Sequence, residues 1–279
     1  MNRLRRARPW LGTLVEIEAE AALDSAAVLA AIDAAFAAIA AVHAAMSVHD
    51  PDSELSRLNA GAHRRALPVS APLLQVLRAA LDLASASDGA FDPVVGGRLT
   101  VLGLLPEAAV AAAPEASWRD LQIDDRGCVQ FARPLRLDLG GIAKGHAVDA
   151  AVAVLRAAGI SAAQVNAGGD LRVFGAAPQR IALRDPRAPS RLAHAIELQD
   201  QALATSAPYH TAAAGLPSAL IEPRSGQPYA GGDSLSVIAP TCLIADALTK
   251  VALFATTERR DALLERHDAR LLILSADSR

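Results

Sequence analysis

The first clear pattern of hydrophobic and polar positions alternates with a period of two. Over residues 14–18 (LVEIE), Val15 and Ile17 alternate with Glu16 and Glu18, which predicts a half-buried strand. Asp24 or Ser25 then stands before a long alanine-rich segment that reaches about residue 45, which predicts a helix with a capped N-terminus. The chain is therefore expected to open with a strand followed by a helix.

Two shorter helices are expected next. Residues 50–54 begin a short helix that ends near Asn59, and residues 70–72, with their proline, begin another that runs to about Ser87. Gly89 is expected to end this second helix.

The rest of the chain is rich in predicted strands. Residues 129–131 and 135–137 are expected to form a strand pair, and a helix over residues 143–158 is expected to end at Gly159. Further strands are predicted over residues 163–166, 171–174, 180–184, 193–198, 202–205, 235–239 and 270–274, and helices over residues 243–255 and 258–266. Because short turns join successive strands, we expect an α+β fold with largely antiparallel sheets and flanking helices.

Composition narrows the class of protein. The chain has 279 residues, of which 52% are hydrophobic and 20% charged, and its formal net charge is -3. These values are typical of a folded globular protein, and they provide no basic surface for a nucleic-acid partner. No linker or repeat separates clean domains, so residues 1–279 are predicted to form a single domain. The two cysteines, Cys128 and Cys242, are too few for a disulfide framework and are expected to be small buried side chains.

The N-terminal region carries arginines that resemble the charged start of a secretory signal. The apolar run after Trp10 is broken by Glu16 and Glu18, however, which favours a strand. The alanine-rich stretch contains Asp33 and His43 and lacks large aliphatic residues, so it is expected to be a core-facing helix and not a membrane span. We therefore expect a cytoplasmic protein with no membrane span.

The most informative chemical motif is DLGGIAKGHAVD, residues 138–149. Glycines at the start of a helix leave backbone N–H groups free to approach a phosphate, and Lys144 can pair with an anion while Asp149 fixes polar geometry. The motif fits neither the dinucleotide-binding nor the P-loop spacing, and a glycine-rich connection with an exposed lysine explains it equally well.

Other motifs have both a functional and a structural interpretation. Residues 89–93, GAFDP, can supply a floor and a carboxylate for a planar ligand, or form a turn. Residues 166–170, NAGGD, can form a tight hairpin, which is favoured locally, or let the backbone approach a ligand. Thr205 and residues 222–226 can hold polar groups of a ligand, although turn formation also explains them. Asp246 can bind a hard cation or can be favoured by the dipole of its helix, whereas the seven histidines are too scattered for a metal cluster.

Taken in order, these segments resemble the ApbE family of FAD:protein FMN transferases. The segments that carry the resemblance are RPWLGT (8–13), MSVHDPDSELSRLN (46–59), GAFDP (89–93), DLGGIAKGHAVD (138–149), NAGGD (166–170), ATS (204–206), PRSG (223–226) and ADAL (245–248). The resemblance covers nearly the whole chain. It implies an α+β fold related to the T-fold, with a ligand cleft between two intimate halves.

The resemblance also implies an activity and a set of site residues. Members cleave FAD at its pyrophosphate and transfer FMN to a threonine or serine hydroxyl of a client flavoprotein, with release of AMP, and they bind Mg²⁺. The residues implied to bind FAD are Leu11, His49, Ala90, Phe91, Asp92, Gly140, His146 and Leu220. The implied metal ligands are Ala143, Asp246 and Thr249, and the implied catalytic residues are Asp246, Lys144 and Thr205.

The chain departs from the family pattern at several of these positions. His49 and His146 stand where the family usually has an aromatic residue, and Ala219 stands where it has a histidine. Glu222 replaces an aspartate, and Lys250 replaces a threonine four residues after Asp246, where its ammonium group could take the place of the cation.

Three hypotheses follow for the function. The first is a magnesium-dependent FAD:protein FMN transferase. The second, motivated by Ala219 and Lys250, is a catalytically weakened homologue that acts as an FAD- or adenine-nucleotide-binding module. The third is a scaffold that binds no ligand.

Overall fold

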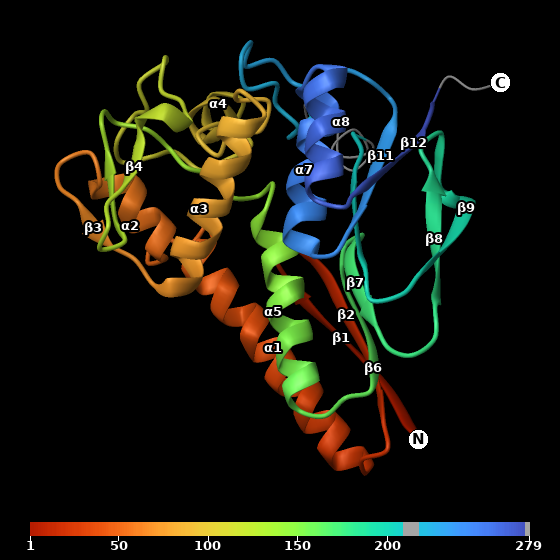
Figure 1. Ribbon diagram of the computed structural model, residues 1–279. Coiled ribbons are helices and arrows are strands. Elements are labelled where there is room, and N and C mark those ends of the chain that lie inside the picture. The colour runs from red at the N-terminus through yellow and green to blue at the C-terminus, as the bar shows by residue number, and fades with distance from the viewer. Residues whose placement is uncertain (209–217, 277–279) are drawn as a thin grey trace.

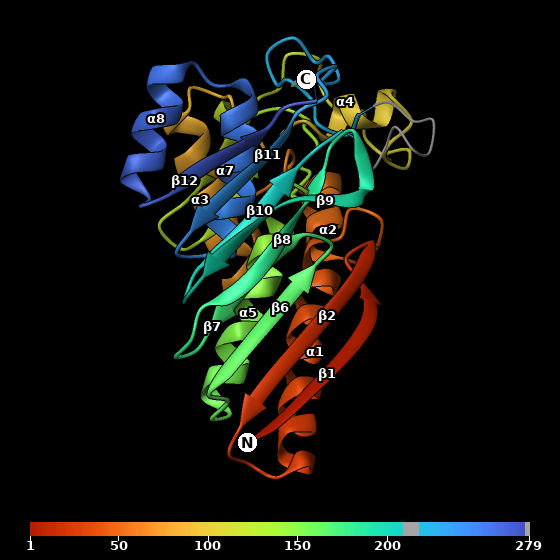
Figure 2. The same cartoon turned by 90° about the vertical axis from the view of Figure 1, so that its right-hand side faces the viewer.

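The central feature of the fold is an antiparallel sheet. The computed structural model describes residues 1–208 and 218–276, and within them the sheet has seven strands in the order β1-β2-β6-β7-β10-β11-β12 (Figures 1 and 2). The strands are β1 (Asn2–Trp10), β2 (Thr13–Ala21), β6 (Ala162–Ala167), β7 (Asp170–Phe174), β10 (Ala202–Ser206), β11 (Ser234–Ala239) and β12 (Arg270–Leu274). Each neighbouring pair is antiparallel, which confirms the α+β prediction.

Helices cover one face of this sheet. Figure 2 looks onto the strands, with α1 (Ser25–Met46), α5 (Ala143–Ala157) and α7 (Cys242–Phe254) behind them, while α8 (Thr257–Arg266) lies to one side, next to α7 and β12. The alternation in β2 buries Val15, Ile17 and Ala19 against these helices. On the opposite face, the hairpin β8 (Gln179–Asp185) and β9 (Ala188–Leu198) packs on β7, β10 and β11 through a separate apolar cluster.

The remaining elements form a second, mainly helical part beside the sheet (Figure 1). Its helices are α2 (Glu54–Gly61), α3 (Ala71–Ala86) and α4 (Gly96–Val101). A small antiparallel sheet, ordered β3-β5-β4, consists of β3 (Leu67–Pro68), β4 (Leu121–Ile123), which follows a 3-10 turn at Trp118–Asp120, and β5 (Cys128–Phe131). One apolar cluster continues from this part into the core between the sheet and its helices.

Capping residues place the helix ends where the sequence predicts them. The Asp24 carboxylate accepts a hydrogen bond from the Ala27 N–H at 2.7 Å and begins α1, and the Ser53 hydroxyl does the same for α2. Ser70 precedes α3, and Gly89 and Gly159 adopt positive φ values just beyond α3 and α5.

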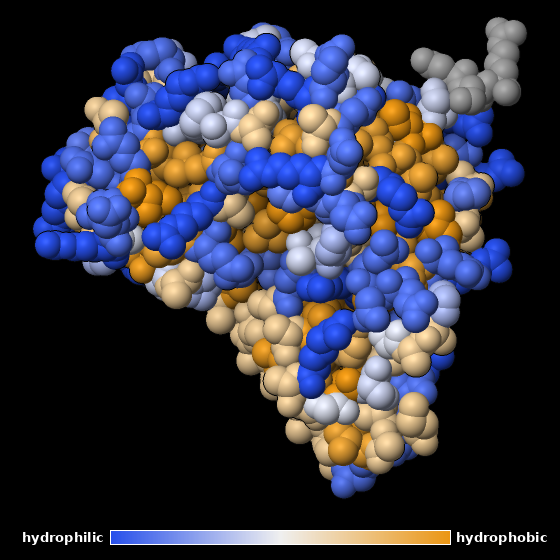
Figure 3. Space-filling model, in the orientation of Figure 1, coloured by the Kyte–Doolittle hydropathy of each residue, from blue (hydrophilic) through white to orange (hydrophobic). Residues whose placement is uncertain are grey.

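Helix α1 is apolar along most of its length. It is the one helix within the described residues that is long and apolar enough to cross a membrane, with a mean hydropathy of 2.1. Its buried side chains recur at helical spacing, for example at Val28, Ile32, Phe36 and Ile39, and they belong to the core beneath the sheet. Alanines dominate its outer face, which shows as pale orange in the lower part of Figure 3. This packing agrees with the prediction of a core-facing helix.

The predicted strand over residues 135–137 is wrong. The Asn59 side chain binds both backbone groups of Leu137, with an Oδ1 to N distance of 2.8 Å and an Nδ2 to O distance of 3.0 Å, and the Arg136 carbonyl accepts from the Gly96 N–H. Because these groups are already satisfied by other segments, they do not join a sheet ladder. The partners of β5 are instead β3 and β4.

Strand β1 was not predicted, because its side chains are mostly exposed and carry little apolar alternation. Arg3 and Arg5 of β1 form ion pairs with Glu18 and Glu16 of β2, respectively. Opposite charges therefore accompany the backbone hydrogen bonds between these two strands at the edge of the sheet. The hydrophobic pattern also does not predict the short elements β3, β4 and α4.

Candidate active site

A cavity of about 430 Å³ lies where the helical part meets the main sheet and its helices. Its wall comprises the loop after α3, the segment leading into α5, the end of β10, the segment from Ser218 to Pro223, and the cavity-facing side of α7. Leu99 of α4 and two leucines that follow it add apolar surface. Segments distant in sequence therefore converge on one ligand-sized space.

The structure brings most of the predicted FAD-binding and catalytic residues together. Those that line the cavity are His49, Ala90, Phe91, Asp92, Gly140, Lys144, Thr205 and Leu220. The other predicted residues, Leu11, Ala143, His146, Asp246 and Thr249, do not line it.

Leu11, for example, lies in the turn between β1 and β2 with a φ of 57°, beside a separate shallow hollow that includes Trp10 and His43. His146 is buried within α5, and burial lowers the pKa of its imidazole. Thr249 is completely buried, and its hydroxyl donates to the Asp246 carbonyl oxygen at 2.7 Å. Because a hydroxyl has one proton to donate, Thr249 accepts the hydrogen bond from the Ser206 hydroxyl, whose oxygen is also 2.7 Å away.

Helices α5 and α7 cap each other's N-termini. Asp149 of α5 accepts hydrogen bonds from the Cys242 and Leu243 N–H groups of α7, at 3.0 and 2.9 Å. Asp246 of α7 accepts one from the Gly145 N–H of α5, at 3.2 Å. Each carboxylate thus satisfies free N–H groups and lies at the positive end of the other helix dipole. This reciprocal arrangement fixes the position of α7 relative to the segment around Lys144.

Removal of the Asp149 carboxylate should destabilise the fold more than removal of an ordinary cap. We expect Asp149→Ala to lower the free energy of unfolding by about 2 kcal/mol, because two N–H groups and the Arg172 guanidinium, 2.7 Å away, lose their partner. Asp24→Ala, at the exposed cap of α1, is the control and should cost about 1 kcal/mol. Urea unfolding measures both variants, and an equal loss of unfolding free energy in the two would show that Asp149 acts only as a local cap.

Two lysine–aspartate pairs form the charged wall of the cavity. The Lys144 ammonium contacts the Asp170 carboxylate, and the Lys250 ammonium contacts the Asp246 carboxylate and lies 3.0 Å from the Asp246 carbonyl oxygen. The two carboxylates have side-chain exposures of 2% and 0%, whereas Lys144 and Lys250 retain 33% and 17%. The ammonium groups therefore stand on the cavity side, with the carboxylates behind them.

The charge states of these groups follow from their neighbours. Burial alone lowers the pKa of Lys144, but attraction to Asp170 and Asp246 outweighs it and holds that pKa above its usual value. Burial raises the pKa of Asp246, but Lys250 and Lys144 outweigh it and hold that pKa below its usual value. Lys144 is consequently charged, and its ammonium group presents positive charge to a ligand.

Asp92 brings a carboxylate to the same cavity. Its oxygens accept hydrogen bonds from the Val94 N–H at 2.8 Å and the Trp118 N–H at 3.2 Å. Burial dominates over these bonds and raises the pKa of Asp92 to about 6. Asp92 is therefore a group whose charge changes just below neutral pH.

The stability of the chain should depend on pH through Asp92. Because the folded state holds this proton more tightly than the unfolded state, ionisation costs stability as pH rises from about 4 to about 6. The unfolding free energy of the unmodified chain, relative to Asp92→Asn, should fall by on the order of 3 kcal/mol across that window. Urea unfolding of both proteins at several pH values measures this change. A difference in unfolding free energy between the two proteins that stays constant with pH would contradict the prediction.

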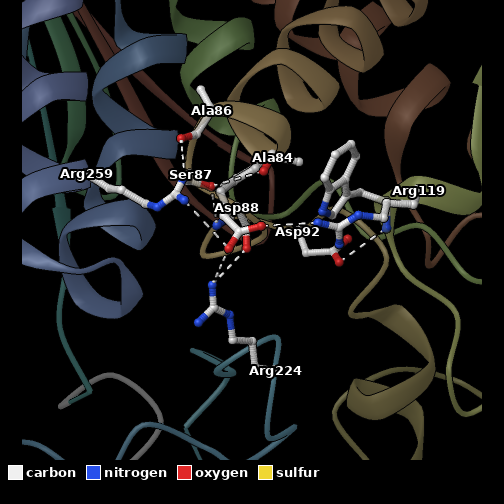
Figure 4. Close-up of polar contacts among 10 residues, drawn as sticks. Ala84, Ala86, Ser87, Asp88, Asp92, Arg119, Arg224 and Arg259 are labelled. Atoms are coloured by element: carbon white, nitrogen blue, oxygen red, sulfur yellow. Dashed lines mark hydrogen bonds and ion pairs between the residues drawn. The ribbon is translucent and has the colours of Figure 1, made fainter.

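An ion-pair cluster around Asp88 fastens the segments that border the cavity (Figure 4). The Asp88 carboxylate lies 3.1 Å from Arg119 and 2.9 Å from Arg224, and Arg259 of α8 is 3.9 Å away. Asp88 directly precedes the GAFDP motif, and Arg224 belongs to the PRSG motif. The cluster thus connects two motifs that are more than 100 residues apart in the sequence.

Some cavity residues had no signal in the sequence. Leu99 and the leucines that follow α4 belong to a region where no element was predicted, and Phe254 lies at the end of an otherwise ordinary apolar helix. Asp138 lies within the predicted motif and lines the cavity, and burial raises the pKa of its carboxyl group.

The chain is similar to known proteins over most of its length. The sequence model described as the ApbE family matches residues 11–274. An FAD:protein FMN transferase from Vibrio cholerae is 31% identical over 248 residues, which are 82% of this chain and 74% of that protein. One from Rhodobacter capsulatus is 36% identical over 214 residues, which are 70% of this chain but only 40% of that protein, so the chain spans less than half of that relative's length.

Solved structures share the fold. The flavin transferase ApbE from Vibrio cholerae superposes with a TM-score of 0.81 at 28% identity, with coverage of 98% of this chain and 93% of that one. The ApbE protein from Thermotoga maritima has a TM-score of 0.84 at 26% identity, with coverage of 98% and 94%.

Proposed function

The chain belongs to the ApbE family, and we propose that it is an FAD:protein FMN transferase whose acceptor is a threonine or serine hydroxyl of a client flavoprotein. The observation that carries the proposal is that six residues predicted to bind FAD and two predicted as catalytic line one cavity, which has two ammonium groups in its wall. Relatives that bear the transferase name match most of the chain.

The proposed reaction is a phosphoryl-type transfer. The acceptor hydroxyl oxygen forms a bond to the phosphorus nearest the flavin, and the bond from that phosphorus to the bridging oxygen of the pyrophosphate breaks. AMP leaves with the electron pair, and the hydroxyl proton passes to solvent. The chain's contribution is to orient the pyrophosphate and to oppose the negative charge of the departing AMP.

Individual residues have distinct roles in this proposal. Phe91 and Leu220 supply apolar surface on the cavity wall, which suits a flavin or adenine ring. Lys144 supplies positive charge, and Asp170 holds it in place while accepting a hydrogen bond from the Thr205 N–H at 3.3 Å. Thr205 is itself fixed by a 2.8 Å hydrogen bond to the Ser236 hydroxyl.

The implied Mg²⁺ site does not fit the way this chain arranges its donors. The Asp246 carboxylate already binds the Gly145 N–H with one oxygen and Lys250 with the other, and the Thr249 hydroxyl is engaged by Ser206. No group of three or more His, Cys, Asp or Glu side chains within residues 1–208 and 218–276 could hold a metal ion. Mg²⁺ requires several oxygen ligands in octahedral geometry, and an adjacent ammonium group repels it.

Nucleotide analysis tests the proposed activity. Purified chain, FAD and a client domain with an acceptor threonine should yield AMP in equal amount to the FAD consumed, and a client in which that threonine is alanine should yield none. FAD that is bound and recovered intact with both clients would contradict the transferase proposal and support the binding-module hypothesis.

A further inference from the structure

The use of lysine in this chain is confined to the cavity. Of its 27 lysines and arginines, 25 are arginines, and the two lysines are Lys144 and Lys250. Both line the cavity, although they come from different helices, and each contacts a buried aspartate. Arginine provides the positive charge everywhere else in the sequence, which sets these two positions apart chemically.

An ammonium group differs from a guanidinium in ways that suit this position. It is a compact point charge with three donors, whereas a guanidinium is a broad planar fork. Lys250 reaches the Asp246 carboxylate and carbonyl oxygen together, and its Cε lies 3.4 Å from where a Cβ on Gly141 would stand. The space beside Asp246 therefore holds a small cation that is covalently attached to α7.

We propose that this chain uses the ammonium group of Lys250, together with that of Lys144, as a tethered cation that takes the place of a divalent metal ion in binding the pyrophosphate of FAD. This inference rests on the proposed function, because it assigns the site of that same substrate. Asp246 and Asp170 hold the two ammonium groups from behind, which leaves their cavity-facing donors for phosphate oxygens.

A tethered cation should make the binding of FAD independent of divalent metal ions. The affinity of the full chain for FAD, measured by quenching of flavin fluorescence, should agree within about twofold between EDTA and excess Mg²⁺, because the site already carries its cation. Lys250→Met should weaken binding roughly tenfold or more in both conditions, through loss of a charge-assisted contact to phosphate. Lys250→Thr should bind weakly in EDTA and regain affinity on addition of Mg²⁺, because it exposes Asp246 and adds an oxygen ligand.

A matched control separates local charge from net charge. Arg126→Met removes one positive charge from an exposed turn between β4 and β5 and should leave the affinity for FAD unchanged. The proposal is overturned if Mg²⁺ raises the affinity of the unmodified chain tenfold or more, or if Lys250→Met binds FAD as the unmodified chain does.

A spectroscopic measurement on the unmodified sequence does not depend on any variant folding. Because there are two lysines, a chain labelled with 15N-lysine should give two side-chain ammonium signals. FAD added in EDTA should shift both signals, and Mg²⁺ added alone should shift neither. Displacement of the Lys250 signal by Mg²⁺ alone would overturn the proposal.

The outcomes also distinguish this inference from the proposed function. Binding that requires Mg²⁺, followed by transfer of FMN, would refute the tethered cation and leave the transferase intact. A folded chain that binds no FAD in either condition would refute both.

Discussion

Replacement of Gly145 by alanine is expected to destabilise the chain by at least about 3 kcal/mol and to abolish FAD binding. A Cβ atom at this position would stand 2.2 Å from the Cys242 carbonyl oxygen and 2.7 Å from the Leu243 nitrogen. These are backbone atoms at the start of α7, so the clash cannot be relieved by rotation of a side chain. Helices α5 and α7 would have to separate, and the reciprocal caps would break with them.

The control for this substitution is Gly61→Ala at the end of α2. There the added Cβ would lie 3.4 Å from a terminal methyl group of Leu67, which can move. Alanine is a better helix former than glycine, so this variant should be neutral or more stable by up to about 1 kcal/mol. Urea unfolding measures both, and similar stabilities for the two variants would show that contact between α5 and α7 is not required.

Lys144→Met is expected to have the largest effect among changes to the charged wall. It leaves the buried Asp170 carboxylate without its cation, which should lower the free energy of unfolding by about 3–5 kcal/mol. FAD binding should weaken as well, because the cavity loses one of its two ammonium groups.

A second substitution distinguishes an unpaired charge from lost packing. In the Lys144→Met background, Asp170→Asn removes the uncompensated charge and keeps an oxygen that can accept from the Thr205 N–H, 3.3 Å away in the unmodified chain. Most of the lost stability should return, although the affinity for FAD should not. Additive losses from the two changes would contradict the ion-pair explanation.

The elements that the sequence predicts well are those specified by local chemistry. Asp24 and Ser53 cap their helices through their own side chains, and the alternation in β2 needs only the next few residues to be recognised. The spacing of Asp246 and Lys250 is also local, because residues four apart face each other on a helix.

The features that the sequence does not predict depend on contacts between distant segments. Asn59 lies 78 residues from Leu137, yet its amide decides that residues 135–137 form no strand. Asp149 caps a helix that begins 93 residues later, so periodicity within either helix contains no sign of it. The same holds for the site. The motifs contain half of the lining residues, but they do not indicate that the two lysine–aspartate pairs are oriented toward the cavity.

The intact mass of a client domain after incubation with the chain and FAD tests the proposed transfer most directly. We expect a gain equal to one FMN less one water, which is absent when the acceptor threonine is replaced by alanine and which persists in EDTA. An unchanged client mass, with FAD bound by the chain and a client that a known family member does modify, would contradict it.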